Sequence, residues 1–314
     1  HEQINYAIDK GVNFLDTAEL YPVPAHKDRY AATEKVIGNW FKKNGNREDI
    51  VLASKIAGKA DMTKFIRTTG FTRESIIDAV EGSLQRLQTD YIDLYQLHWP
   101  DRSTNYFGQR GYKHDISDHW EDNIHQVLET MRDLIREGKI KHVGISNETP
   151  WGTMRFLEES KVHGTLPRTI TIQNPYSLLN RLFEVGMAEI SMREQVGLLA
   201  YSPMGFGALS GKYLGDRMPE GSRLSLFPQY NRYIGKTAVE ATKKYYELAQ
   251  ANGLTLAQMA LAFVNTRPFV TSTIIGATSM RQLEENIDSI DVNLSEDIIE
   301  KIEAIHNSIP NPAP

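Results

Sequence analysis

Seven short apolar runs alternate with helical patterns along the 314-residue chain, and this alternation constrains the fold more than any other feature. The middle of each run is Val, Ile, Leu or Tyr with few charges, which is typical of parallel strands covered on both faces. Strict alternation over this length indicates a doubly wound sheet or a (β/α) barrel. The runs span residues 12–17, 50–55, 91–98, 140–146, 169–174, 197–202 and 271–276.

Amphipathic helices are expected between these runs. Residues 73–87 place apolar side chains at helical spacing, and Thr72 is a suitable N-cap. Residues 123–137 form a second apolar stripe, which Gly138 would end as a C-cap residue. Further helices are expected at residues 3–10, 237–252 and 256–265.

The number of runs bears on the closure of a barrel, which needs eight strands. The chain shows seven, and a helix at residues 3–10 leads into the first of them. We therefore expect a first strand upstream of residue 1 and one (β/α)8 TIM-barrel domain over residues 1–314. The stretches 22–30, 102–120 and 212–234 lack apolar periodicity, and we expect them to build the substrate pocket.

Composition excludes several classes of protein. The chain has no cysteine, so disulfides, thiolate metal centres and a catalytic thiol are excluded. This absence fits a reducing compartment, and we expect a cytoplasmic protein. A net charge of −5 without a basic run predicts no nucleic-acid partner and no membrane surface. The oligomeric state is left open.

Polar or reactive residues stand at the end of each predicted strand. In a parallel barrel these ends converge on one face, where polar residues are typical of catalysis or binding. A single Asp or Lys at a strand end is usually solvated or paired, but seven polar ends together favour a site. In chain order they are Asp16, Lys55, His98, Ser146 with Asn147, Gln173 with Asn174, Tyr201 with Ser202, and Gly276.

These residue types favour acid–base chemistry at a carbonyl group. Tyr21, just beyond Asp16, has a reference pKa of about 10, and a nearby Lys55 ammonium would favour its phenolate form. A neutral His98 could orient a substrate oxygen. Since no side chain delivers hydride, a cofactor must.

Other reactive patterns are weak. No Gly-x-Ser-x-Gly motif occurs, and no pair of histidines has metal-ligand spacing on one helix. His114, Asp118 and His119 lie in a polar loop, where structural or solvent-facing roles are expected. The sequence thus leads us to expect no metal site.

Several segments resemble the aldo-keto reductases. FLDTAELY at residues 14–21 is similar to the family signature in which the Asp and the Tyr five residues later are catalytic. VLASK at 51–55, DLYQLHWP at 93–100 and EGKIKHVGISN at 137–147 extend the resemblance, which covers the whole chain. Residues 21–24 and 171–181 look most like the bacterial Tas-type subgroup, which is akin to the potassium-channel β-subunit-like reductases.

The resemblance implies roles for these residues, with cofactor binding before the carbonyl substrate. Tyr21 would be the general acid for reduction, Lys55 paired with Asp16 would lower its pKa, and His98 would orient the carbonyl. Ser146, Asn147 and Gln173 would hold the nicotinamide carboxamide, with Tyr201 stacked on the ring. The segment that would line the pyrophosphate contains Ser202, Pro203, Met204, Gly205, Phe206, Leu209, Gly211 and Lys212. The adenosine end would lie near Gly276, Thr278, Gln282, Glu285 and Asn286.

The preferred cofactor is expected to be NADP(H). Many family members hold its 2′-phosphate with Lys and Arg after the last strand, where this chain has Gly276 and Gln282. The channel-subunit-like branch instead uses a Lys and an Arg from the preceding loop, and Lys212 and Arg223 fit those positions. Salt-bridged surface roles for these two cations are the alternative.

Two other functions are left open. The first is a binding protein that holds NADP(H) and reports redox state to a protein partner. The second is an aldolase in which Lys55 forms a Schiff base, or a metal-dependent hydrolase, on the same barrel. For the reductase, the loops predict small aldehydes and ketones as substrates. Four aromatic residues of the 102–120 loop either cover the pocket or pack the loop onto the barrel; they are Tyr106, Phe107, Tyr112 and Trp120. Met204 and Phe206 could also reach the substrate.

Overall fold

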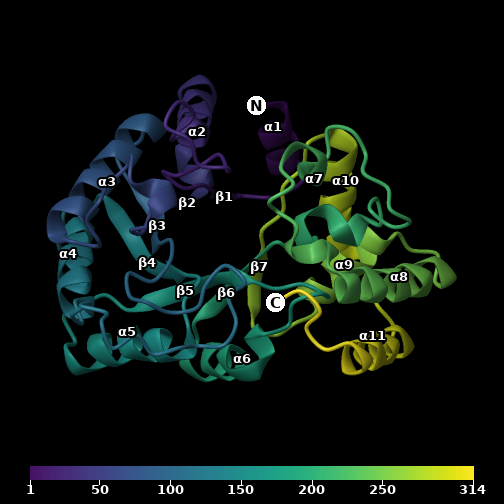
Figure 1. Cartoon of the computed structure of the whole chain (residues 1–314). Coiled ribbons are helices and arrows are strands. Elements are labelled where there is room, and N and C mark those ends of the chain that lie inside the picture. The colour runs from purple at the N-terminus through teal and green to yellow at the C-terminus, as the bar shows by residue number, and fades with distance from the viewer. The chain divides into compact units, whose positions relative to one another are not determined.

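The computed structural model describes residues 1–314 and divides the chain into two compact units (Figure 1). The first unit comprises residues 1–106 and 111–173, and the second comprises residues 107–110 and 174–314. The predicted alternation of strands and helices continues through both units.

The first unit is built on parallel strands that pair in chain order. β1 (Phe14–Asp16) pairs with β2 (Val51–Ile56), which pairs with β3 (Ile92–Leu97). β4 (Ile140–Ser146) follows β3 and pairs with β5 (Thr169–Pro175). The register sets Lys55 beside Gln96, and Ser146 beside Gln173. Because every pair is parallel, the polar residues at the carboxyl ends share one edge.

Helices of the first unit follow the strands as the apolar pattern predicted. In Figure 1, α3, α4 and α5 succeed one another along one side of the strands. α3 has the predicted bounds, and the Thr72 side chain accepts a hydrogen bond from the Ser75 backbone N–H as its N-cap. The helices are α1 (Glu2–Asp9), α2 (Ala32–Asn44), α3 (Arg73–Leu87), α4 (Ile124–Arg136) and α5 (Pro150–Val162).

A buried carboxylate and a glycine fix α2 against its neighbours. Glu34 of α2 is fully buried, and its oxygens accept hydrogen bonds from Ser54 Oγ and Arg86 Nε, both at 2.6 Å. One turn further, Gly38 meets the end of α3, where an added Cβ would lie 2.8 Å from the Leu87 carbonyl carbon. The close approach of the two backbones therefore depends on glycine at this position.

The second unit holds the remaining strands, β6 (Gly197–Tyr201) and β7 (Val270–Thr273), which are parallel partners. α9 is almost entirely buried, and Thr255 and Gln258 form a capping box at its start. The helices are α6 (Phe183–Glu194), α7 (Arg223–Leu226), α8 (Lys236–Ala251), α9 (Leu256–Asn265), α10 (Met280–Asp288) and α11 (Glu296–Ser308). None of the protein's helices has the length and apolar content needed to cross a bilayer.

Parallel strands alternating with helices are consistent with the predicted (β/α)8 TIM-barrel fold of aldo-keto reductases. A strand upstream of residue 1 and a single domain stay predictions. Some predicted boundaries were wrong. β1 covers only residues 14–16 of the predicted 12–17, and β7 ends at Thr273, three residues before Gly276. The chain there enters the turn that begins α10, where the Thr278 backbone N–H and Oγ1 both donate to Gln282 Oε1.

Substituting Gly38 tests how closely α2 and α3 pack. Gly38→Ala should lower the free energy of unfolding by about 1–3 kcal/mol, because a new methyl group forces the helix backbones apart. Urea denaturation measures this loss. Gly164→Ala is the matched control, since a Cβ at Gly164 meets nothing within 4 Å. Equal stability of the two variants would contradict the close packing.

Candidate active site

The centre of the candidate site is a buried ion pair between Lys55 and Asp16. Lys55 Nζ donates to Asp16 Oδ1 at 2.9 Å, to Oδ2 at 2.7 Å, and to the Thr17 carbonyl oxygen at 2.7 Å. The lysine side chain is fully buried. Burial lowers the pKa of Lys55, and the adjacent Asp16 carboxylate opposes that shift. Three acceptors match the three donors of an ammonium group.

Tyr21 and His98 flank this pair. Lys55 Nζ lies 5.2 Å from the centroid of the Tyr21 ring, and the His98 ring meets the Tyr21 ring edge-on at 5.5 Å. Leu20, Ala57 and Trp99 form the apolar cluster against which Tyr21 packs. The structure therefore gathers the four residues that the sequence predicted as a catalytic group.

His98 is held in its neutral form. Burial, aided by the positive charge of Lys55, keeps the pKa of His98 well below its usual range. Its backbone N–H donates to the Ile56 carbonyl oxygen at 3.1 Å, and its side-chain Nδ1 has no partner. A neutral imidazole beside Tyr21 is suited to hydrogen bonding with an uncharged carbonyl oxygen.

Two glutamines extend the hydrogen-bond network behind Asp16. Gln173 Nε2 donates to Asp16 Oδ1 at 2.8 Å and to Gln96 Oε1 at 3.3 Å. Gln96 Nε2 also reaches Asp16 Oδ1 at 3.3 Å. The sequence predicted Gln173 as a cofactor contact but missed Gln96. The only signal for Gln96 was its position near the end of β3, the strand that follows the one carrying Lys55.

Ser146 and Asn147 are tied into the same network through backbone groups. Ser146 Oγ donates to the Gln173 carbonyl oxygen at 2.8 Å, and Asn147 Nδ2 donates to the His98 carbonyl oxygen at 2.9 Å. Asn147 has a φ of 53°, a left-handed conformation that Asn tolerates better than most residues. Both predicted cofactor contacts are buried at the strand ends, next to His98.

Glu19 anchors the segment that carries Tyr21, and sequence reasoning missed it. The buried Glu19 carboxylate pairs with Arg67 and accepts a hydrogen bond from the Ala57 backbone N–H at 2.6 Å. These contacts tie the end of β2 to the residues between Asp16 and Tyr21. A Glu inside the FLDTAELY motif was the available signal, but nothing in the sequence indicated Arg67 as its partner.

The 102–120 stretch is an irregular loop whose ends are tied down. Arg102 pairs with Glu148, and its Nη2 also donates to Thr149 Oγ1 at 3.0 Å. At the other end, Trp120 meets Trp151 edge-on at 6.4 Å. Trp99, Trp120 and Glu148 contribute to the lining of one cavity in the first unit, so this part of the loop packs against neighbouring elements.

Two of the three loop residues weighed as metal ligands, His114 and Asp118, have partners within the protein. His114 Nδ1 shares a hydrogen bond with Tyr112 Oη at 3.0 Å. Asp118 accepts from the Ser103 backbone N–H at 2.9 Å and from the Trp120 backbone N–H at 3.0 Å. These contacts favour the structural roles expected for the loop.

In the second unit, a tight glycine-rich loop follows β6. Ser202 and Phe206 have left-handed φ values of 54° and 53°, as do Gly205 and Gly207 at 51° and 91°. A Cβ on Gly207 would lie 3.0 Å from Lys212 Nζ, so the lysine side chain runs close along the loop backbone. Successive turns of this kind turn backbone N–H groups toward anions.

Two cations border this loop without carboxylate partners. Lys212 lies over the Tyr213 ring, 5.2 Å from Nζ to the centroid. The Arg223 guanidinium lies over Phe206 at 4.8 Å and over Tyr230 at 5.6 Å. Neither forms a salt bridge, so the surface-pairing alternative has no support in the structure.

The predicted adenosine contacts lie in the turn before α10 and along that helix. Asn286 Nδ2 donates to the Gly276 carbonyl oxygen at 3.4 Å, and Ser279 caps the helix. Glu285 instead accepts from Thr255 Oγ1 at 2.6 Å, so it also joins α10 to the start of α9.

Comparison with known proteins identifies the family. A sequence model of the aldo/keto reductase family matches residues 1–307. The chain therefore belongs to the aldo/keto reductase family, oxidoreductases that act on small carbonyl compounds and generally use nicotinamide cofactors.

Individual relatives agree with this assignment. The chain is similar to protein Tas of Escherichia coli, with 48% identity over 100% of this chain and 91% of Tas. It is 31% identical to the Bacillus subtilis oxidoreductase YrpG over 95% of this chain and 84% of YrpG. A Schizosaccharomyces pombe protein is named as a voltage-gated potassium channel subunit beta. The chain is 30% identical to it over 98% of this chain and 84% of that protein.

The depressed pKa of His98 predicts a pH-dependent stability. A histidine that stays neutral when folded binds a proton on unfolding below about pH 6.5, so acid favours the unfolded state. The free energy of unfolding should fall below that pH with an added slope approaching about 1.4 kcal/mol per pH unit. Urea denaturation from pH 5 to pH 8 measures the slope.

His98→Gln should remove this component of the slope, whereas His119→Gln, at an exposed position, should keep it. Identical slopes in the two variants would show that His98 is not held neutral.

Proposed function

We propose that the protein reduces aldehydes and ketones of modest size to alcohols with NADPH, and that Tyr21 is the general acid. The observation that carries this proposal is the fully buried Lys55 ammonium, fixed by Asp16 and lying 5.2 Å from the Tyr21 ring centroid. Family membership supports carbonyl reduction in general.

A nicotinamide cofactor, when bound, would supply the hydride that the carbonyl carbon receives. Tyr21 gives its phenol proton to the carbonyl oxygen, which becomes the alcohol hydroxyl. The Lys55 ammonium stabilises the phenolate that remains, because opposite charges favour each other strongly away from water. Neutral His98 donates a hydrogen bond to the same carbonyl oxygen and orients it before proton transfer.

Two groups of residues are proposed to contact a nicotinamide dinucleotide, and each group lies within a single unit. In the first, Ser146, Asn147 and Gln173 are proposed to hold the nicotinamide carboxamide, since their polar groups are buried at the strand ends. In the second, Tyr201 would stack on the ring. The loop from Ser202 to Lys212 would hold the pyrophosphate, because its left-handed turns and the nearby lysine favour an anion.

The adenosine end is proposed to lie near Gly276, Thr278, Gln282, Glu285 and Asn286. Lys212 and Arg223 would recognise the 2′-phosphate that distinguishes NADPH from NADH. Both cations lack a carboxylate partner, so neither has to break a salt bridge to bind phosphate.

Removing the Tyr21 hydroxyl tests the proposed general acid. Tyr21→Phe should lower kcat for aldehyde reduction by about 10²–10⁴-fold, because proton transfer to the carbonyl oxygen is lost. NADPH should still bind, which cofactor fluorescence titration checks. Tyr6→Phe removes the same hydroxyl on α1 and should leave kcat unchanged. A fully active Tyr21→Phe enzyme would rule out this role.

Cofactor preference is tested by neutralising the two cations. The Lys212→Met/Arg223→Met variant should raise KM for NADPH by about tenfold or more, since charged hydrogen bonds to the phosphate are lost. KM for NADH should rise less than KM for NADPH, because NADH loses only the contact of Lys212 with the pyrophosphate. Lys244→Met, at an exposed lysine of α8, should affect neither cofactor. Equal losses with NADPH and NADH would contradict recognition of the 2′-phosphate.

Similarity to proteins named as channel subunits favours one alternative function. The protein could hold NADP(H) tightly, turn over slowly and report redox state to a protein partner. Stopped-flow measurement of cofactor release and of aldehyde turnover separates the two functions. Slow release of the cofactor and slow turnover of aldehydes, together with a specific protein partner in pull-downs, would favour the redox-reporting function.

A further inference from the structure

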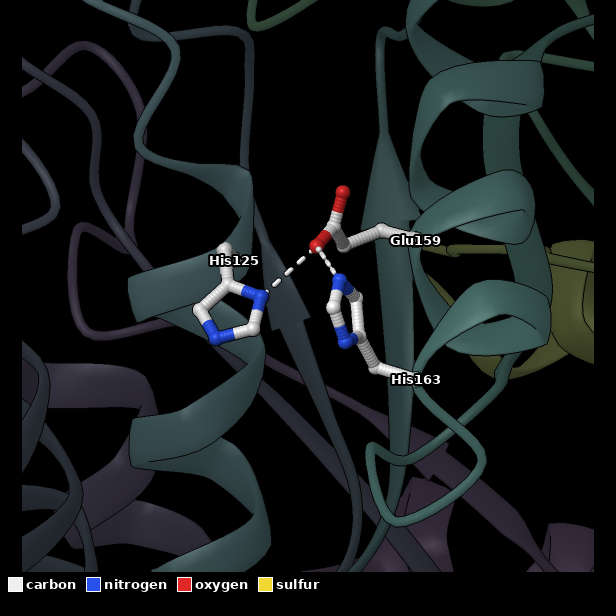
Figure 2. Close-up of side chains that lie close together, drawn as sticks. All are labelled: His125, Glu159 and His163. Atoms are coloured by element: carbon white, nitrogen blue, oxygen red, sulfur yellow. Dashed lines mark hydrogen bonds and ion pairs between the residues drawn. The ribbon is translucent and has the colours of Figure 1, made fainter.

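We propose that His125, Glu159 and His163 form a binding site for a divalent transition-metal ion, with Zn²⁺ as the expected occupant. His125 is on α4, while Glu159 and His163 are on α5 and at its C-terminal cap. Figure 2 shows both imidazole rings turned toward the same carboxylate oxygen. The proposal does not rest on the reductase function, and it departs from our sequence-based expectation of no metal site.

The donor atoms already converge as a metal site requires. His125 Nδ1 lies 2.6 Å from Glu159 Oε1, and His163 Nε2 lies 3.2 Å from the same oxygen. All three donor atoms lie within 4.8 Å of one another. Bonds of about 2.0–2.1 Å to tetrahedral zinc separate neighbouring ligand atoms by about 3.3 Å. To bind the ion, the imidazole rings of His125 and His163 therefore need to move by about 1 Å. Both side chains are roughly half exposed.

The donor set selects the class of metal. Two imidazole nitrogens and one carboxylate oxygen suit Zn²⁺, Cu²⁺ or Ni²⁺, whereas Mg²⁺ and Ca²⁺ prefer oxygen ligands alone. Water would complete a tetrahedron, because both histidines are open to solvent. Two rings directed at one oxygen are also explained by hydrogen bonding without metal, and the experiment below distinguishes the two.

Neighbouring charges hold the ligands in place. Arg155 pairs with the other carboxylate oxygen of Glu159 and donates from Nε to Asp122 Oδ2 at 2.7 Å. This leaves Glu159 Oε1 to face the histidines.

The far nitrogen of His125 also has an acidic neighbour. Glu129 Oε2 lies 3.8 Å from His125 Nε2, one helical turn along α4. A carboxylate behind a ligating histidine fixes the ring and strengthens the nitrogen that binds the metal. At 3.8 Å this contact is longer than a hydrogen bond, and Glu129 would become a positioning residue once the ring shifts onto the metal.

Metal binding would cross-link α4 to α5. The ion would join two helices that the chain otherwise connects through side-chain packing and the His125–Glu159 contact. The sequence pattern missed the site because its ligands come from two helices, so no single helix carries a histidine pair. The Glu159 and His163 spacing of four residues was the only local signal.

Calorimetric titration of the full-length, metal-free protein with ZnCl₂ at pH 7.5 tests the site. One equivalent should bind, with MgCl₂ giving no heat of binding. His125→Gln and His163→Gln should each weaken Zn²⁺ binding at least about tenfold, and Glu129→Gln should weaken it about tenfold. His119→Gln, at an exposed loop histidine, is the matched control and should bind as the unmodified protein does.

A second measurement covers variants that fail to fold. On the unmodified protein, NMR of the imidazole nitrogens during the Zn²⁺ titration should shift two of the nine histidines. Zinc at about 100-fold above Kd should also raise Tm by a few degrees. Absence of stoichiometric binding, or unchanged affinity in His125→Gln and His163→Gln, would overturn the proposal and leave a hydrogen-bonded cluster.

Discussion

The buried contact between Lys55 and Asp16 is the interaction on which the rest of the site depends. Removing two charges from water costs several kcal/mol for each ion, so such a pair persists only where its geometry is nearly ideal. Here every donor of the ammonium has an acceptor: both Asp16 oxygens and the Thr17 carbonyl. That geometry requires β1 and β2 in parallel register, with their ends at one edge of the sheet.

One buried cation acts on two neighbouring side chains. Burial lowers the pKa of His98, and the charge of Lys55 adds to that shift, so the imidazole is available as a neutral hydrogen-bond donor. The same cation lies 5.2 Å from the centroid of the Tyr21 ring, and in the proposed mechanism it would stabilise the phenolate of Tyr21. A solvated lysine would be screened by water and would influence both residues far less. In the proposed mechanism, the burial of Lys55 therefore serves the chemistry as well as the fold.

The sequence predicted the main architecture and the central four residues because both follow local patterns. Apolar runs gave the strands, and α3 and α9 were predicted with their observed bounds. Boundaries failed where loop hydrogen bonds decide them, as at Thr273, which ends β7 before Gly276.

Residues that act through distant partners could not be predicted. Gln96 joins Asp16 only because three strands place their ends together, and Arg67 pairs with Glu19 across 48 positions. The three proposed metal ligands likewise depend on α4 packing against α5. In each case the chemistry lies in a contact between elements, which periodicity within one element does not reveal.

The central claim is that Lys55 tunes Tyr21 as the proton donor. The most direct test is the pH dependence of the single-turnover rate of aldehyde reduction with bound NADPH, in the unmodified protein and in Lys55→Met. The rate should fall at alkaline pH as Tyr21 loses its proton, and in Lys55→Met that fall should move to higher pH, because the cation no longer stabilises the phenolate. An alkaline limb at the same pH in both proteins would contradict the account.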